Sequence, residues 1–367
     1  MKNINSVKNC YGCGVCARIC PKKIISIQHN KEGFYEPFIN NLQECTNCSL
    51  CTKACAYLHT DLAVTNFPMK SYAGWSNDKT TRLSCSSGGI GFEIAKSSIN
   101  HGYKVCTVKY DEKNQRAEHY IAETIEDLEK SKGSKYIQSY TLNAFIKINR
   151  KDKYLITGTP CQIDSFRRYI KLLKIEENFI LMDFFCHGVP SILLWKAYLN
   201  NIKNLNNLNV LTTKWRDKKY GWHDSWMISI KGEKYEYESK ASTGDYFYQH
   251  FLGNNCLGKA CYLNCKYKYD KSSADIRIGD LWGKLYKSNE EGVSAVITFT
   301  QKGNNLLQSL SQCSLKEHSL QETAEGQMKT SPAFNEYKWK LFFVLLRFPY
   351  NFSILKIVYK FLRIFSK

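Results

Sequence analysis

Eight cysteines near the amino end form two runs with the same spacing. The runs read Cys10-x-x-Cys13-x-x-Cys16-x-x-x-Cys20-Pro21 and Cys45-x-x-Cys48-x-x-Cys51-x-x-x-Cys55. Gaps of two residues let consecutive thiolates converge on one soft metal centre, and thiolates select iron–sulfur clusters or zinc. The chemistry indicated by these residues is therefore metal binding through sulfur.

Three close gaps in succession are typical of bacterial two-cluster ferredoxins, in which the fourth cysteine of each run binds the other cluster. This rule predicts one [4Fe–4S] cluster on Cys10, Cys13, Cys16 and Cys55, and a second on Cys45, Cys48, Cys51 and Cys20. Two structural zinc sites or a disulfide framework are the alternatives, but zinc sites use Cys-x-x-Cys pairs separated by a longer gap. Ala56 stands where a second proline is usual, and this leaves the ligand count unchanged.

A second group of cysteines lies in the larger, carboxyl-terminal part of the chain. Residues 154–157 and 179–185 read as strands and residues 162–173 as the helix between them. Such a βαβ unit has parallel strands, so Cys161 and Cys186 come together at the carboxyl edge of the sheet, where open α/β sheets bind ligands. We predict a third [4Fe–4S] cluster here, with a mixture of structural and redox thiols as the alternative. The other candidate ligands are Cys256, Cys261 and Cys265.

The elements that must position these cysteines suggest three parts. We expect a two-cluster ferredoxin domain over residues 1–66, a main domain over 70–330 and a basic amphipathic helical tail over 331–367. The expected fold class is α/β with an amino-terminal α+β ferredoxin-type domain. The main domain should hold a mixed, partly parallel sheet, followed by carboxyl-terminal helices. In it, residues 84–91 form a small-residue loop before an apolar helix, which indicates an anion site at a helix start or an ordinary glycine-rich turn.

The cysteine count and the net charge restrict the possible functions. The 16 cysteines and the lack of an apolar core in the first ten residues favour a reducing cytoplasm over a secreted disulfide protein. With 52 basic and 33 acidic residues the formal charge is +19. A basic surface suits acidic partners. We expect no nucleic-acid partner, because no binding motif accompanies the charge.

In its motifs the chain resembles the coenzyme F420 hydrogenase/dehydrogenase beta-subunit family of iron–sulfur flavoproteins, in particular bacterial members found with polysaccharide-biosynthesis enzymes. After the double cysteine run, the ordered motifs are SCSSGG, KGSKYIQS, GTPCQI, DFFCHGVPS, WRDKKYGW, ADIRIGDLWG and GVS. The ordered set is far more specific than any one motif. Two positions depart from the family pattern: Cys261-x-x-x-Cys265 replaces Cys-x-x-Cys, and residues 271–273 replace an expected arginine.

The resemblance implies FAD in the main domain beside the third cluster. It also implies oxidation or reduction of a substrate stacked on the flavin, either the deazaflavin coenzyme or another conjugated or sugar-like molecule. Residues implied to contact the cofactor are Cys85, Ser86, Ser87, Gly88, Gly89, Lys135, Gly158, Thr159 and Pro160. Asp275 and Asp280 would fix backbone turns or bind a ribityl hydroxyl.

Two residues are candidates for catalysis. His187 could exchange a proton at neutral pH, or it could serve at a helix start or support a neighbouring group. Lys135, together with Arg216 and Lys218, could hold a phosphate or carboxylate, and solvated surface charge is the alternative for all three.

The carboxyl-terminal tail is apolar, aromatic and basic over residues 339–348 and again over 352–365. Neither piece reaches the ~20 apolar residues that span a bilayer. The pattern suits peripheral contact with the inner face of a membrane or packing against the protein's own core.

Three functions stay open on the sequence. The first is an FAD- and [4Fe–4S]-dependent oxidoreductase with its own small-molecule substrate, and the second an electron-transfer subunit that feeds a partner protein. The third is a metal- or nucleic-acid-binding protein without redox activity, which the ordered motifs disfavour.

Overall fold

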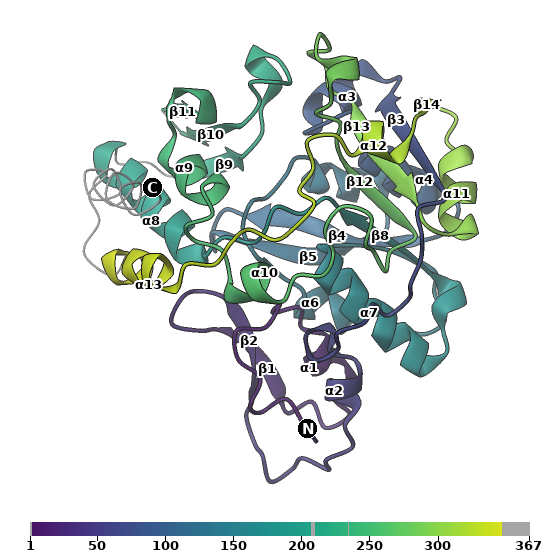
Figure 1. Cartoon of the computed structure of the whole chain (residues 1–367), viewed down its shortest axis with the longest axis vertical. Helices are drawn as coiled ribbons and strands as arrows, with labels where there is room; N and C mark the ends of the chain where they lie inside the picture. Colours follow the sequence, from purple (N-terminus) through teal and green to yellow (C-terminus); the bar gives the residue numbers. More distant parts are fainter. Residues whose placement is uncertain (1, 207–209, 234, 347–367) are drawn as a thin grey trace.

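The structure is a computed structural model that describes residues 2–206, 210–233 and 235–346. Its elements form three sheets of two, three and nine strands. In Figure 1 the amino-terminal module lies at the bottom, the large sheet at the centre and right, and the three-stranded sheet at the upper left. The α/β class with a mixed, partly parallel main sheet is confirmed.

The amino-terminal module is a hairpin with two short helices. Strands β1 (Ile25–His29) and β2 (Tyr35–Ile39) pair in antiparallel fashion. The helices are α1 (Val15–Ile19) and α2 (Leu50–Lys53), followed by one 3-10 turn at Ala56–Leu58. Each α-helix lies inside one of the two cysteine runs: α1 contains Cys16 and α2 contains Cys51.

The nine-stranded sheet carries the predicted βαβ unit at its centre. Its strand order is β14-β3-β13-β12-β8-β7-β4-β5-β6. The neighbours β12, β8, β7 and β4 are parallel, and β5 pairs in parallel with β6, whereas the other pairs are antiparallel. The bounds are β3 (Lys70–Ser76), β4 (Lys104–Asp111), β5 (Arg116–Ala122), β6 (Ser139–Tyr140), β7 (Tyr154–Thr157), β8 (Phe179–Phe184), β12 (Ile276–Asp280), β13 (Ser294–Thr298) and β14 (Cys313–Glu317).

Helices connect these strands, and α7 (Pro160–Leu173) is the predicted crossover between β7 and β8. Pro160 occupies its first turn, and the Gln162 side chain accepts a hydrogen bond from the Thr159 backbone N–H at 2.9 Å, so the helix start is locally encoded. The other helices in this part of the protein are α3 (Lys79–Ser84), α4 (Ile90–Asn100), α5 (Ile125–Leu128), α6 (Leu142–Phe145), α10 (Lys259–Leu263), α11 (Gln301–Gln308) and α12 (Leu320–Thr323).

A separate lobe, which the sequence did not suggest, stands beside the large sheet (Figure 1). It consists of the antiparallel strands β9 (Val210–Lys214), β10 (Met227–Gly232) and β11 (Glu236–Lys240) with helices α8 (Ile192–Asn206), α9 (Tyr246–Leu252) and α13 (Glu336–Leu345). One apolar core joins this lobe to the amino-terminal module, because Phe34 belongs to the same buried cluster as Trp195 and Phe247.

The described part of the tail packs on this lobe. Trp339, Phe342 and Phe343 of α13 are buried, and the Phe343 ring lies 6.1 Å from that of Phe34. Core packing therefore accounts for Trp339, Phe342, Phe343 and Leu346, whereas Val344 is half exposed. The predicted amphipathic segment 352–365 lies outside the described residues. Within the described ranges, no helix combines the length and apolar character needed to cross a bilayer.

Candidate iron–sulfur and cofactor site

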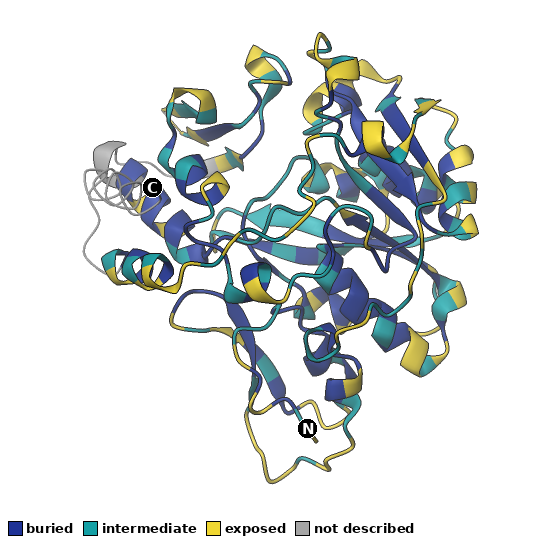
Figure 2. Cartoon of the chain, viewed as in Figure 1, coloured by how far each residue is buried: buried dark blue, intermediate teal, exposed yellow. Residues whose placement is uncertain are grey.

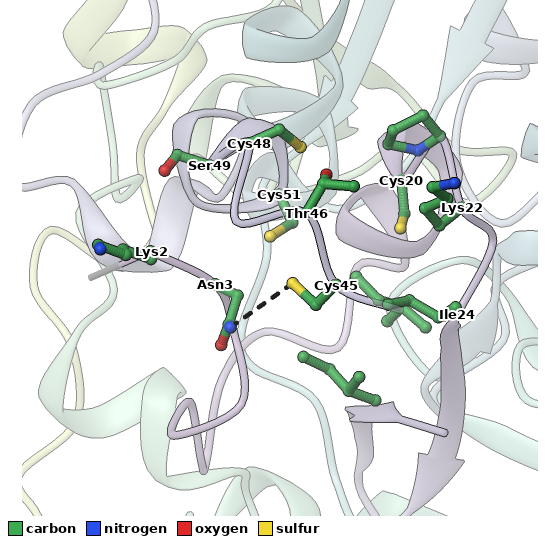
Figure 3. Close-up of a pocket in the computed structure, with 13 residues that line it drawn as sticks. Lys2, Asn3, Cys20, Lys22, Ile24, Cys45, Thr46, Cys48, Ser49 and Cys51 are labelled. Carbon is green, nitrogen blue, oxygen red and sulfur yellow. Dashed lines mark hydrogen bonds between the residues drawn. The ribbon is translucent and has the colours of Figure 1, made fainter. Parts of the chain in front are cut away.

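The eight amino-terminal cysteines gather into two sockets of four. Cys10, Cys13, Cys16 and Cys55 line one cavity, here called the inner socket because it faces the main domain. Cys20, Cys45, Cys48 and Cys51 line the other, here called the outer socket and drawn in Figure 3. The structure thus groups the cysteines across the two runs in the way that the ferredoxin spacing predicts.

The sockets suit iron–sulfur clusters chemically. Their lining is largely apolar, and burial raises the pKa of Cys55 to about 12, with the neighbouring Cys13 thiol adding to the rise. Such thiols stay protonated in the empty protein, so metal binding must release their protons. Within the described ranges, no group of His, Cys, Asp or Glu side chains closes around a single metal ion. The four thiols of each socket instead surround a cavity.

The third cysteine group follows the carboxyl ends of β7 and β8. Burial raises the pKa of Cys161, and the charges that add to this rise are those of Cys186, Cys261 and Cys265. These four half-buried thiols are therefore close enough to interact electrostatically, and the Val189 N–H, three residues after Cys186, donates to the Cys261 Sγ at 3.4 Å. Cys256 is fully buried in the apolar core of the lobe, and the neighbouring Cys261 adds to the rise in its pKa that burial causes. As a ligand of this group Cys256 stays a prediction.

A buried ion pair holds the segment that carries Cys265. Arg277 and Asp183 are both fully buried and pair at 2.7 Å. The remaining guanidinium donors bind the backbone carbonyls of Tyr267, Tyr269 and Lys271 at 2.9–3.1 Å. One arginine therefore fixes the backbone of the loop between α10 and β12, which carries Cys265.

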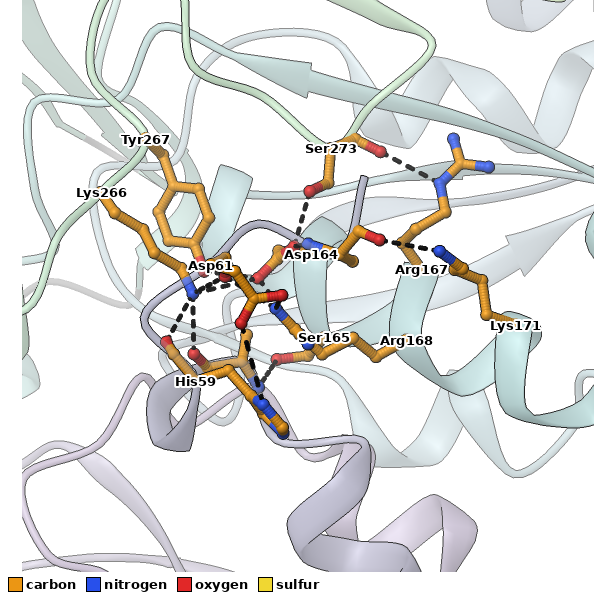
Figure 4. A network of polar contacts seen from close by, with 12 residues as sticks. His59, Asp61, Asp164, Ser165, Arg167, Arg168, Lys171, Lys266, Tyr267 and Ser273 are labelled. Carbon is orange, nitrogen blue, oxygen red and sulfur yellow. Dashed lines mark hydrogen bonds and ion pairs between the residues drawn. The ribbon is translucent and has the colours of Figure 1, made fainter. Parts of the chain in front are cut away.

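A second polar network ties the amino-terminal module to the same loop (Figure 4). Its centre is Asp164 in α7, whose carboxylate accepts hydrogen bonds from the Ala63 N–H at 2.6 Å, the Ser273 hydroxyl at 2.6 Å and the Tyr267 hydroxyl at 2.9 Å. The Lys266 ammonium donates to the carbonyls of the 56–61 segment. The chain leaving the inner socket is thereby fastened to the loop that carries Cys265.

A cavity of about 470 Å³ opens at the carboxyl ends of β7, β8 and β12. This volume lies within the range of cofactor sites, and the position is the ligand-binding edge expected for parallel strands. Cys186 lines it, so the cavity borders the third cysteine group. The other predicted cofactor residues that line it are Cys85, Ser86, Ser87, Gly89, Lys135, Gly158, Thr159 and Asp280.

The small-residue loop enters α4 at the wall of this cavity. Gly88 permits close backbone packing, because a Cβ there would lie 2.2 Å from the Gly74 carbonyl oxygen. Gly89 is the residue before the helix, and no side chain caps this end. The helix start therefore offers backbone N–H groups and the positive end of the helix dipole to an anion.

Two lysines predicted to face an anion or solvent do neither. The Lys135 ammonium donates to the carbonyls of Ser131, Lys132 and Gly133 at 2.7–2.9 Å. The Lys218 ammonium donates to the carbonyls of Arg82, Ser87 and Glu291. Burial lowers the pKa of Lys135 to about 7 and that of Lys218 to about 8. Both side chains hold the loops that line the cavity, so we assign them to positioning.

Arg216 is likewise no surface charge. Its guanidinium lies against the rings of both Trp226 and Trp282, with centroids at 4.9 and 5.1 Å, and pairs with Asp280 at 3.1 Å. Trp222 donates to the same carboxylate at 2.9 Å. Asp280 therefore lines the cavity but uses its oxygens to hold this stack, which makes hydrogen bonding to a ribityl hydroxyl a poorer role for it. Asp275 binds the Leu181 N–H and Arg167, so it fixes backbone as expected.

His187 also lines the cavity, next to Cys186. Its ring packs edge-on against Phe251 at 4.9 Å, and its buried Nε2 has no hydrogen-bond partner among the described residues. Burial, reinforced by the Lys268 charge, lowers the pKa of His187. The ring is thus neutral near pH 7, and its Nε2 is, in the described part of the chain, a buried polar atom without a partner beside the cavity.

Signals in the sequence did not identify all the residues that build this site. Tyr11 lines both the inner socket and the cavity, and its ring contacts Tyr57 at 5.4 Å and Tyr267 at 5.9 Å. Asp164 and Lys268 hold surrounding backbone. Only the position of Tyr11 inside the first cysteine run could have drawn attention to it.

Taken together, the parallel sheet edge and the two amino-terminal sockets of four thiols indicate an iron–sulfur redox protein. Family models agree with this class. Models described as coenzyme F420 hydrogenase/dehydrogenase beta subunit match residues 71–146 and 151–322, and a 4Fe-4S dicluster domain model matches residues 9–58. The chain belongs to the coenzyme F420 hydrogenase/dehydrogenase beta-subunit family and carries a 4Fe-4S dicluster domain.

Among solved structures, the chain is similar to one from the F420-reducing [NiFe] hydrogenase complex of Methanosarcina barkeri. The two are 17% identical, with a TM-score of 0.48 over 70% of this chain and 84% of that one. A search of curated proteins finds no match.

Proposed function

We propose that this protein is an iron–sulfur flavoprotein oxidoreductase with three [4Fe–4S] clusters and one FAD. The observation that carries the proposal is the position of the third thiol group, which borders the 470 Å³ cavity through Cys186 and connects to the inner socket through Tyr11. FAD, when bound, would supply hydride exchange with a substrate and single-electron exchange with the clusters.

The chain's own residues divide the binding of FAD between two ends of the cavity. The start of α4 suits the pyrophosphate, since its N–H groups and dipole favour an anion. The opposite end, near Cys186 and His187, suits the flavin ring because it is close to the third thiol group. His187 lines this end, with its ring packed against Phe251.

The three thiol groups form an ordered path for electrons. The outer socket lies at the surface, the inner socket contacts the main domain, and the third group borders the cavity. Tyr11 lies between the inner socket and the third thiol group. Its hydroxyl donates to the carbonyl of Asn264, the residue before Cys265, at 2.5 Å. We propose this order for electron transfer in either direction.

The proposed substrate is a small conjugated or sugar-like molecule, such as a deazaflavin coenzyme or a glycan precursor. The cavity supports this class through its aromatic lining, which includes Trp226, Trp282 and Phe251. A reducing cytoplasm is the proposed location, because the clusters require free thiols.

The test is anaerobic purification followed by counts of iron, sulfide and flavin. We expect about twelve irons and one FAD per chain. About eight irons would remove the third cluster, and a pale preparation with zinc and no flavin would overturn the proposal.

An electron-transfer subunit without its own substrate is the second candidate. The family is described as a beta subunit, and the similar solved chain comes from a hydrogenase complex. Bleaching of the flavin by candidate substrates in the purified chain alone would favour the first candidate. Bleaching only after a partner protein is added would favour the second.

A further inference from the structure

The outer socket is open to solvent on the side away from the main domain. Residues 40–44 and 46–48 are exposed, including Cys48, and Figure 2 shows the loop at the bottom of the molecule in yellow. The inner socket, in contrast, has Cys13, Cys16 and Cys55 buried. The outer socket is therefore the cluster site that another protein can approach.

Basic side chains surround this opening. Lys2 and Lys22 line the outer socket and lie on opposite sides of its sulfur atoms in Figure 3. Lys23 follows in the turn after Cys20, and Lys53 ends α2, the helix that contains Cys51. All four are exposed, and the acidic residue in the adjoining loop is Glu44.

The four ammonium groups differ from those of several half-buried lysines elsewhere in the protein. Lys135, Lys218, Lys266 and Lys302 each donate to several backbone carbonyls. For the four lysines at the outer socket, no ion pair or side-chain hydrogen bond is found within residues 2–206, 210–233 and 235–346. Their charges are thus available to an outside partner.

We propose that this surface docks a small acidic one-electron carrier protein of the ferredoxin or flavodoxin kind. The proposal rests on the proposed function and names its partner. Complementary charge steers encounter and orients the carrier so that its redox centre faces Cys48. A cluster held by Cys20, Cys45, Cys48 and Cys51 would exchange one electron with the docked carrier, with no bond made or broken.

The experiment measures binding of a purified acidic two-cluster ferredoxin to the cofactor-loaded full-length chain at several salt concentrations. The variant is Lys2→Glu/Lys22→Glu. We expect its Kd at low salt to rise by roughly tenfold or more, and the salt dependence of the wild-type Kd to be steeper than that of the variant. The matched control is Lys151→Glu/Lys174→Glu, which makes the same charge change at two exposed lysines before β7 and after α7.

The outcomes separate this proposal from the proposed function. Iron, sulfide and flavin are counted in each variant, so a failure of the cofactor assignment is seen directly. If the loaded chain binds the ferredoxin with equal affinity in all three forms, or binds a DNA duplex but no ferredoxin, the docking proposal is overturned. If the control variant binds the ferredoxin as weakly as the Lys2→Glu/Lys22→Glu variant, the effect comes from net charge alone, and the docking proposal is overturned as well.

Discussion

The inner and outer sockets have the same cysteine spacing but opposite surroundings. In the inner socket three of four cysteines are buried and the loop is bound to the main domain, where Gln138 donates to the Tyr11 carbonyl at 3.1 Å and Thr141 to the Cys13 carbonyl at 2.8 Å. The outer socket has an exposed Cys48 and unpaired lysines. Two sites with the same cysteine spacing therefore differ in burial through packing alone.

This difference explains how one small module can serve two ends of an electron path. Burial protects the inner site from solvent and places it near the third thiol group, whereas exposure gives the outer site access to a carrier. The four changes below test whether the packing of the inner socket against the main domain is more sensitive to substitution than the exposed outer part of the module.

Removal of a cluster ligand should have the largest effect. Cys13→Ala is expected to lose roughly four of about twelve irons and to block electron transfer from a carrier to the cavity. It should also lower Tm more than Cys48→Ala, because Cys13 belongs to the core shared with Phe145 and Ile163. Iron counting, EPR and thermal unfolding provide the measurements. Cys313→Ala, outside all three thiol groups, should keep every iron, and loss of iron there would contradict the assignment.

Asp164→Asn tests the network that fastens the inner module to the main domain. The carboxylate is fully buried and accepts three hydrogen bonds, so its loss should lower the free energy of unfolding by about 3–5 kcal/mol. Asp61→Asn, on the exposed rim of the same network, should cost less than about 1 kcal/mol. Urea unfolding measures both, and equal costs would show that Asp164 does not anchor the module.

Acid should weaken the inner side of the molecule through His119. Burial lowers its pKa to about 4, and its ring lies 5.9 Å from that of Phe145 in the core shared with the inner socket. The unfolded chain, with an ordinary pKa of about 6.5, binds a proton that the folded chain does not, so stability is full above pH 6.5 and falls towards pH 4 by about 3 kcal/mol.

Urea unfolding between pH 8 and pH 4 measures this loss. His119→Gln should therefore remove part of the pH dependence. An unchanged slope in His119→Gln would refute the role of this ring.

Gly14→Ala should have a smaller effect, localised to the inner loop. Gly14 has φ +73°, and a Cβ there would lie 2.3 Å from the Thr141 hydroxyl that binds Cys13. We expect a loss of about 2 kcal/mol from backbone strain and the disturbed contact. Gly102→Ala, with φ +78° and open space around it, should cost only about 1 kcal/mol. Comparable losses in urea unfolding would mean that the contact contributes nothing.

Several parts of the fold could be predicted because the signals are local. The βαβ unit over β7, α7 and β8 follows from a four-residue apolar strand, a proline at the helix start and a second apolar strand. The lobe of β9, β10 and β11 was missed because its stability comes from distant aromatic residues such as Trp195 and Trp339. The roles first given to Lys135, Lys218 and Arg216 changed for the same reason, since their acceptors lie on other segments or on backbone that the sequence does not reveal.

By itself the sequence determined the ligand types, the exchange of cysteines between the two runs and the sheet edge at which a third group would meet. These follow from residue chemistry and short spacing, which act over a few bonds. Only the tertiary structure decided which socket faces inward, that Cys161, Cys186, Cys261 and Cys265 meet while Cys256 stays in a core, and which lysines keep free charge. Burial and long-range hydrogen bonding set these properties, and neither is defined until distant segments pack together.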